Sequence, residues 1–120
     1  MKSWIGVDLD GTLAKYDGWR GELHIGDPIP AMVERVKDWL ALGCEVRIFT
    51  ARVTEGRTNR DGTLHDNLAV RTVIERWCRQ HIGAVMPITN VKDYGMVALW
   101  DDRAVQVVSN TGRRADGRKD

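Results

Sequence analysis

The chain has 120 residues, 42% of them hydrophobic and 29% charged, and its formal net charge is +1 at pH 7. A chain of this length forms one domain with a single core. Its near-neutral charge gives no strong field for attracting nucleic acid or a membrane surface. No apolar run approaches the roughly 20 residues that cross a bilayer, and the amino terminus lacks the basic and apolar regions of a signal peptide. We therefore expect a cytoplasmic protein without membrane contact.

The two cysteines, Cys44 and Cys78, lack both close pairing and the spacing typical of metal sites. In a cytoplasmic protein this favours reduced, buried thiols over a disulfide. We expect neither cysteine to carry chemistry.

A short apolar segment, residues 4–8, runs directly into two carboxylates and a glycine, Asp8, Asp10 and Gly11. The segment is apolar on both faces, which is typical of a central strand in a parallel sheet. Side chains two residues apart on a strand point the same way, so both carboxylates should face one side at its carboxyl end. Like charges this close repel and either raise a pKa or attract a cation, and neither outcome helps folding. The pair therefore indicates a chemical role.

Residues 15–30 hold several glycines and prolines, which predicts an irregular stretch. Because it also holds large aromatic side chains, among them Trp19, we interpret it as a flap near the end of the first strand. Packing on the domain surface explains Trp19 as well as contact with a substrate does.

Apolar residues recur at three- and four-residue spacing over 32–40, and Gly43 follows them, which predicts an amphipathic helix. Residues 44–49 predict a second strand that ends at Thr50. A strand, a helix and a strand in this order should place the two strands parallel. We therefore expect Thr50 at the same sheet edge as Asp8.

Residues 51–64 are predicted to form a polar loop with three arginines, Arg52, Arg57 and Arg60. A solvated loop is the first explanation for these arginines, and contact with an anionic substrate is the alternative. A second helix is predicted from Asp66 to Gly83. Its buried stripe is expected to consist of Val70, Val73, Ile74, Trp77 and Cys78.

Two further strands are predicted at residues 84–86 and 96–100, joined by a loop that holds Lys92. The later strand ends in a second carboxylate pair. Residues 104–108 form either a fifth strand or a short helix, and their β-branched side chains and the turn-like residues after them favour a strand.

Strands and helices alternate along the chain without an internal repeat or a domain linker. This predicts an α/β fold: a three-layer, Rossmann-like domain with a mainly parallel sheet of about five strands, and ligands bound beyond the carboxyl ends of the strands. The domain should span residues 1–110, and residues 111–120 should form a polar, flexible tail.

Four segments are thus expected to bring functional groups to one sheet edge. A single Asp, Thr or Lys of this kind is more often a cap, a packed residue or solvated surface. Together, several carboxylates suit a hard cation such as Mg²⁺, while a hydroxyl and an amine offer donors to phosphoryl oxygens. The sequence therefore predicts a phosphate site built around a metal ion. Its members are Asp8, Asp10, Thr50, Lys92, Asp101 and Asp102.

Asp-Leu-Asp-Gly-Thr at 8–12, Thr50, Lys92 and Asp101-Asp102 resemble the four motifs of the haloacid dehalogenase superfamily, in content and in order. The resemblance spans residues 4 to about 108. Lys92 fills the third motif as the one lysine between Thr50 and Asp101.

The resemblance implies a phosphatase mechanism. Asp8 would be the nucleophile that forms an aspartyl phosphate, and Asp10 would protonate the leaving oxygen and then activate water. Mg²⁺ would be held by Asp8, the backbone carbonyl of Asp10 and Asp101, with Asp102 as a further ligand or as the residue that orients one. Thr50 and Lys92 would hold the phosphoryl oxygens.

Members of the superfamily that are dehalogenases lack an Asp at the position of Asp10, so the resemblance favours phosphoryl transfer. The intervals after the first and second motifs are too short for a large cap domain, which implies a capless form. Its site is open unless oligomerisation covers it, and the five tryptophans leave the oligomeric state open. The substrate would be a phosphorylated small molecule or a larger phosphate monoester.

Residues 10–15, Asp101-Asp102-Arg103 and Gln106-Val107-Val108 also look like the phosphatase half of bacteriophage polynucleotide kinase. A polynucleotide 3'-phosphatase, acting on a nucleic-acid 3'-phosphate end, is therefore the main alternative, and the arginines of the 51–64 loop would serve it. The chain has no Gly-Lys pair, so the phosphate-binding loop of the kinase half is missing.

A receiver domain of a signalling pathway is a remote alternative because it combines a similar length with a phosphorylated Asp, Mg²⁺, Thr and Lys. Its acceptor Asp follows the third strand, whereas the third strand predicted in this chain ends in Met86-Pro87. The order of the motifs therefore argues against this alternative.

Overall fold

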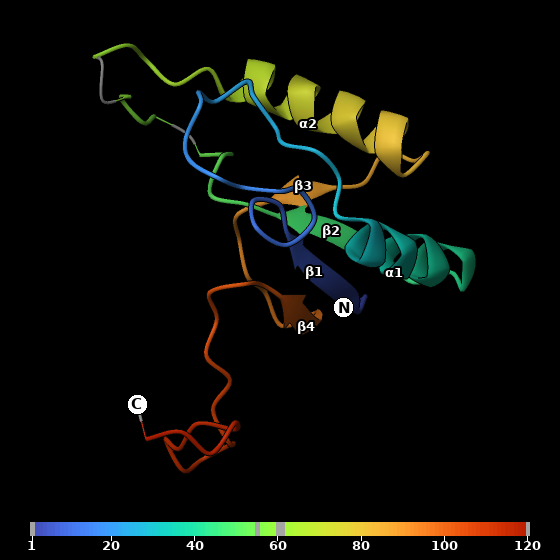
Figure 1. Cartoon of the computed structure of the whole chain (residues 1–120), viewed down its shortest axis with the longest axis vertical. Helices are drawn as coiled ribbons and strands as arrows, with labels where there is room; N and C mark the ends of the chain where they lie inside the picture. Colours follow the sequence, from blue (N-terminus) through green and yellow to red (C-terminus); the bar gives the residue numbers. More distant parts are fainter. Residues whose placement is uncertain (1, 55, 60–61, 120) are drawn as a thin grey trace.

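The computed structural model of the chain describes residues 2–54, 56–59 and 62–119. These residues form a four-stranded sheet in the order β3-β2-β1-β4, with every neighbouring pair parallel (Figure 1). The order corresponds to the first four strands of a Rossmann-like sheet. In chain order the elements are β1 (Trp4–Asp8), α1 (Pro30–Ala41), β2 (Val46–Phe49), α2 (Asn67–His81), β3 (Ile88–Thr89) and β4 (Met96–Trp100).

One face of the sheet packs against both helices. In the parallel register of β1 and β2, Ile5 lies beside Val46 and Val7 beside Ile48, so these four side chains share a face. The same core cluster takes in the buried stripes of both helices. The stripes consist of Met32, Val33 and Val36 on α1 and Val70, Ile74, Trp77 and Cys78 on α2.

The helix ends follow the signals in the sequence. Pro30 occupies the first turn of α1, and Gly43, with φ +82°, follows its last residue. The side chain of Asp66 caps α2 by accepting a hydrogen bond from the Ala69 amide at 3.0 Å, and Gly83, with φ +88°, follows the helix. Both predicted helices are thus confirmed, although Val73 of the expected stripe is half-buried.

The opposite face of the sheet carries no helix among the described residues, so the expected three layers are two. The buried Trp4 lies on this face, where the Arg47 guanidinium is 4.4 Å from its ring centroid. The Trp4 indole N–H donates to the Asp93 carboxylate at 2.8 Å. Asp93 belongs to the short connection from β3 to β4, which is too brief to hold a covering helix.

The prediction of a third strand at residues 84–86 is wrong. The observed strand begins four residues later, at Ile88. Pro87 has no N–H but offers its carbonyl to the Ile48 amide at 2.8 Å and so starts the pairing with β2. The observed β3 is therefore Ile88–Thr89.

The fifth strand predicted at residues 104–108 is also absent from the described part of the chain. Its residues form one arm of a small antiparallel turn, in which Val107 pairs with Arg114 and Asn110 adopts φ +67°. This carboxyl-terminal segment projects away from the sheet (Figure 1), and Val105, Val107 and Val108 are exposed along it. Flexibility of residues 111–120 stays a prediction.

Within the described ranges, no helix has the length and apolar character needed to cross a membrane. Cys44 and Cys78 are both free thiols; Cys78 is buried as predicted, whereas Cys44 is only half-buried. Burial, followed by the charge of Glu75, raises the pKa of the Cys78 thiol to about 12, which makes it a poor nucleophile near neutral pH.

Asp93→Ala should lower the melting temperature at pH 7, because it removes the acceptor of the Trp4 indole and of the Gly95 amide. The hydrogen bond from Trp4, followed by that from Gly95, lowers the pKa of Asp93, so the carboxylate stabilises the fold above its ordinary pKa of about 4. The difference between wild type and variant should shrink as pH falls through the lowered pKa.

Thermal melts at pH 7 and in steps below about pH 4 measure this difference. Asp17→Ala is the matched control, since Asp17 belongs to an exposed ion pair with Arg20. Equal melting temperatures for wild type and Asp93→Ala at pH 7 would contradict the prediction.

Candidate active site

The carboxyl end of β1 continues into a tight loop that positions the first carboxylate pair. The Leu9 carbonyl accepts hydrogen bonds from the amides of Leu13 at 3.0 Å and Ala14 at 2.9 Å, while Leu9 and Leu13 are fully buried. Gly11 adopts φ +88°, and a Cβ at this position would collide with the Asp102 carboxylate. Glycine is therefore required here both for backbone conformation and for the close approach of the second acidic pair.

Asp8, Asp101 and Asp102 form a cluster in which one carboxylate oxygen from each residue lies within 4.8 Å of the other two. Asp8 ends β1 and the other two follow β4, the neighbouring strand of the sheet. Burial is the main reason that the pKa of Asp8 is raised to about 7, and the negative charges of Asp101 and Asp102 add to it. The Thr12 hydroxyl donates to Asp8 at 3.3 Å and opposes the rise.

This cluster fits a divalent cation of the Mg²⁺ type. Its donors are carboxylate oxygens, which hard cations prefer, and they come from two adjacent strand ends. Burial and, after it, the charges of Asp101 and Asp102 raise the pKa of Asp8, and a bound cation would favour its carboxylate form against both.

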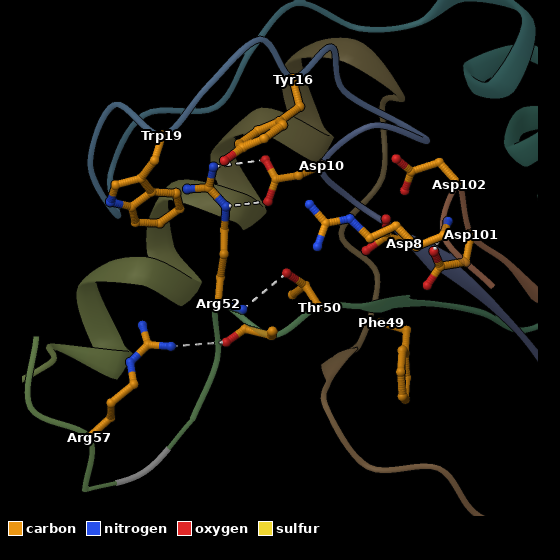
Figure 2. Close-up of a pocket in the computed structure, with 12 residues that line it drawn as sticks. Asp8, Asp10, Tyr16, Trp19, Phe49, Thr50, Arg52, Arg57, Asp101 and Asp102 are labelled. Carbon is orange, nitrogen blue, oxygen red and sulfur yellow. Dashed lines mark hydrogen bonds and ion pairs between the residues drawn. The ribbon is translucent and has the colours of Figure 1, made fainter. Parts of the chain in front are cut away.

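Asp10 faces a different partner, the guanidinium of Arg52. Arg52 donates from Nε to one Asp10 oxygen at 2.7 Å and from Nη2 to the other at 2.8 Å (Figure 2). Its Nη1 donates to the Glu22 carbonyl at 3.0 Å, and its side chain is only 6% exposed. Because both oxygens of Asp10 are engaged in a bidentate pair, the carboxylate is held in one orientation.

The two ends of the flap are hydrogen-bonded to each other, and its middle contacts Arg52 and His65. The Lys15 amide donates to Asp27 and the Ile29 amide to Leu13, so the two ends of the flap lie together. Beyond the Arg52 contact, the Glu22 carboxylate lies 2.7 Å from Nδ1 of the buried His65. Arg52 and His65 therefore connect the flap to the segments that follow β2 and precede α2.

These groups surround an open cavity of about 370 Å³ at the carboxyl edge of the sheet (Figure 2). The acidic cluster lies at one end, and the Arg52–Asp10 pair lies nearer the flap. The lining residues are Asp8, Asp10, Tyr16, Trp19, Phe49, Thr50, Ala51, Arg52, Arg57, Asp101, Asp102 and Arg103.

The structure brings most of the predicted residues together. Those that line the cavity are Asp8, Asp10, Trp19, Thr50, Arg52, Arg57, Asp101 and Asp102. Lys92 is exposed on the loop between β3 and β4 and does not line the cavity, so its contact with a phosphoryl group stays a prediction. Arg60 lies outside the described residues.

Arg103 is a lining residue that we did not predict as part of the site. It follows the second acidic pair directly, and its amide donates to the Asp101 carboxylate at 2.7 Å. Its guanidinium makes no hydrogen bond, ion pair or ring contact with any described residue. Its place in the sequence, directly after two carboxylates at a strand end, could have predicted that it belongs to the site. Tyr16 and Phe49 were missed as well.

No protein-family model matches the chain, and no curated protein is significantly similar to it. The structure is similar to that of a conserved protein coded by a locus of Bacteroides thetaiotaomicron, with a TM-score of 0.58. The two sequences are 19% identical, and the match covers 100% of this chain and 84% of the other. A likeness at this identity shows a common α/β fold and nothing about activity.

Asp8→Asn should raise the melting temperature of the metal-free protein at pH 8 by at least about 4 °C, a change that corresponds to about 1 kcal/mol. The folded protein binds more protons at Asp8 than the unfolded chain does between about pH 4 and pH 7, so its stability falls as pH rises through this window. The advantage of the variant should vanish below about pH 4.

Melts in a chelator at pH 4 and pH 8 measure this effect, with Asp17→Asn as the control for losing an exposed carboxylate. Added Mg²⁺ should raise the melting temperature of the wild type more than that of Asp8→Asn. If the variant shows no gain at pH 8 in chelator, the carboxylate cluster is not a source of strain.

Proposed function

We propose that the chain is a Mg²⁺-dependent phosphohydrolase of the haloacid dehalogenase type that cleaves a phosphate monoester through an aspartyl phosphate on Asp8. The observation that supports this most is the placement of Asp8 in a three-carboxylate cluster, in the same cavity as the separately held Asp10. The two carboxylates of the first motif thus have different surroundings, as two different roles require.

The carboxylates divide the chemistry. An Asp8 oxygen attacks phosphorus and forms the Asp8–phosphate bond as the bond to the leaving oxygen breaks, and Asp10 gives its proton to that oxygen. Asp10, now a carboxylate, takes a proton from water as the water oxygen attacks the phosphorus. Orthophosphate leaves, Asp8 is regenerated as a carboxylate and Asp10 is protonated again.

Asp8, Asp101, Asp102 and the backbone carbonyl of Asp10 would hold the Mg²⁺ ion. When bound, it would neutralise charge on the transferred phosphoryl group and favour the carboxylate form of Asp8.

Arg52 acts as a positioning residue for Asp10 in this mechanism. Each carboxylate oxygen has two lone-pair sites, so an oxygen that accepts from Arg52 retains a site for the proton it transfers. The guanidinium fixes which way this site points, because Arg52 is itself held by the Glu22 carbonyl and by burial. A fixed orientation of the proton donor lowers the entropic part of the activation barrier.

In this proposal Arg103 takes the place of the predicted Lys92 as the cation for the phosphoryl oxygens, and the Thr50 hydroxyl donates to them as well. Among the lining arginines, Arg52 is engaged by Asp10, and Arg57 contacts His65 at 3.2 Å and the Ala51 carbonyl at 3.5 Å. The guanidinium of Arg103 has no such partner in the described ranges. Its geometry suits two phosphoryl oxygens at once.

Polynucleotide 3'-phosphatase activity is the second candidate. The observation that favours it is the position of Arg57 and Trp19 in the same cavity as the carboxylates, where a cation and an aromatic ring can contact a nucleic-acid end. The open cavity also leaves room for a polymer.

Asp8→Asn should reduce Mg²⁺-dependent hydrolysis of an aryl phosphate by at least about 1,000-fold, because the amide is a far weaker nucleophile than the carboxylate. Release of the aryl alcohol, followed with and without Mg²⁺, measures the loss. Asp17→Asn serves as the matched control and should retain wild-type turnover. A variant of Asp8 that keeps most of its turnover would contradict the assignment.

Arg103→Ala should lower kcat/KM by about 100-fold, because a charged donor to the transferred group is lost. Lys92→Ala, which removes a cation outside the cavity, should change kcat/KM by less than about threefold. Millimolar guanidinium ion should restore part of the activity of Arg103→Ala and none of that of Asp8→Asn. A large loss of kcat/KM in Lys92→Ala but not in Arg103→Ala would contradict the role of Arg103. It would indicate instead that Lys92, between β3 and β4, contacts the phosphoryl group.

A further inference from the structure

Two aromatic side chains of the flap, Tyr16 and Trp19, line the cavity and remain exposed to solvent. Tyr16 is 43% exposed and Trp19 is 56% exposed, whereas Leu9 and Leu13 at the base of the same segment are fully buried. The proposed chemistry uses neither ring. Exposed aromatic surface inside a cavity is a common feature of ligand sites, because ring faces bind planar or apolar groups.

Trp19 is held in place by the best-anchored side chain of the site. The Arg52 guanidinium lies 4.9 Å from the centroid of the Trp19 ring, in a cation–π contact. Arg52 is bound in turn by Asp10 and by the Glu22 carbonyl, and it is almost fully buried. The indole is therefore oriented before a ligand arrives, while more than half of its surface stays free.

The rings lie on the side of the cavity where the leaving group would depart. Arg52 joins Asp10, the proton donor to the leaving oxygen, directly to Trp19. Figure 2 shows Tyr16 and Trp19 beside Asp10 and Arg52, at the opposite end from Asp101 and Asp102. A phosphoryl group at the acidic cluster would thus direct the rest of its substrate toward the two rings.

Resting on the proposed function, we infer that the leaving group carries a planar heterocycle of the nucleobase type, which stacks on Trp19 beside Tyr16. A heterocycle presents ring nitrogens and carbonyl oxygens as acceptors. Arg57, which also lines the cavity, can donate to them from the N–H groups that its contacts with Ala51 and His65 do not use. A stacked base adds affinity without needing sequence-specific contacts. A mononucleotide and the 3'-phosphorylated end of an oligonucleotide share this chemistry.

The test compares substrates with the same leaving alkoxide, with and without a base. AMP and ribose 5-phosphate should differ in kcat/KM by at least about tenfold in the wild type, in favour of AMP. Trp19→Leu should reduce this ratio to near one, and Trp19→Phe should keep most of it. Leu23→Ala removes an equally exposed apolar side chain of the flap that does not line the cavity, and it should leave the ratio unchanged. A 3'-phosphorylated oligonucleotide, assayed alongside, distinguishes the two sources of the base.

Binding to Asp8→Asn, measured by calorimetry with AMP and with ribose 5-phosphate, provides a readout that needs no turnover. Tighter binding of AMP that is lost in Asp8→Asn/Trp19→Leu supports the aromatic subsite, even if the wild type hydrolyses no phosphate monoester and the proposed function fails. Hydrolysis with equal kcat/KM for the two substrates, or a preference for AMP that survives Trp19→Leu, overturns the subsite while leaving the phosphatase proposal intact.

Discussion

The bidentate ion pair between Arg52 and Asp10 connects the ends of two strands to the flap of the candidate site. Asp10 follows β1, Arg52 follows β2, and the same guanidinium contacts the Glu22 carbonyl and the Trp19 ring of the flap. Removing the Asp10 carboxylate would leave the nearly buried Arg52 guanidinium without its partner, which is far more costly than losing an exposed pair. The pair therefore determines both the direction of the proposed proton donor and the position of the flap.

The separation of charges in the cavity follows from this pairing. Asp10 is paired with a protein cation, whereas none of the described residues brings a cation as close to Asp8, Asp101 or Asp102. Only the second group depends on an added cation for relief of its repulsion. Two carboxylates separated by one residue in the sequence thus belong to two electrostatically different halves of one cavity.

The sequence predicts the features that depend on interactions between residues close together in the chain. Strand β1, both helices and the carboxylates at strand ends follow from apolar periodicity, caps and parallel register. The position of β3 depends on the pairing of the Pro87 carbonyl with β2, and the missing third layer depends on how briefly the chain crosses the sheet between β3 and β4. The Arg52–Asp10 pair and the Arg103 guanidinium in the cavity are tertiary features that no spacing rule specifies.

Because both ends of the flap are fixed to the core, residues within the flap can change substrate specificity without affecting the fold. Hydrogen bonds between Lys15 and Asp27 and from the Trp77 indole to the Gly26 carbonyl at 3.0 Å fasten the two ends of the flap to the core. The residues between these ends can then be exchanged or lengthened without disturbing the carboxylate cluster, provided that the contacts of Glu22 are kept. The proposed catalytic edge could thus be redirected to a different leaving group by replacing a single surface loop.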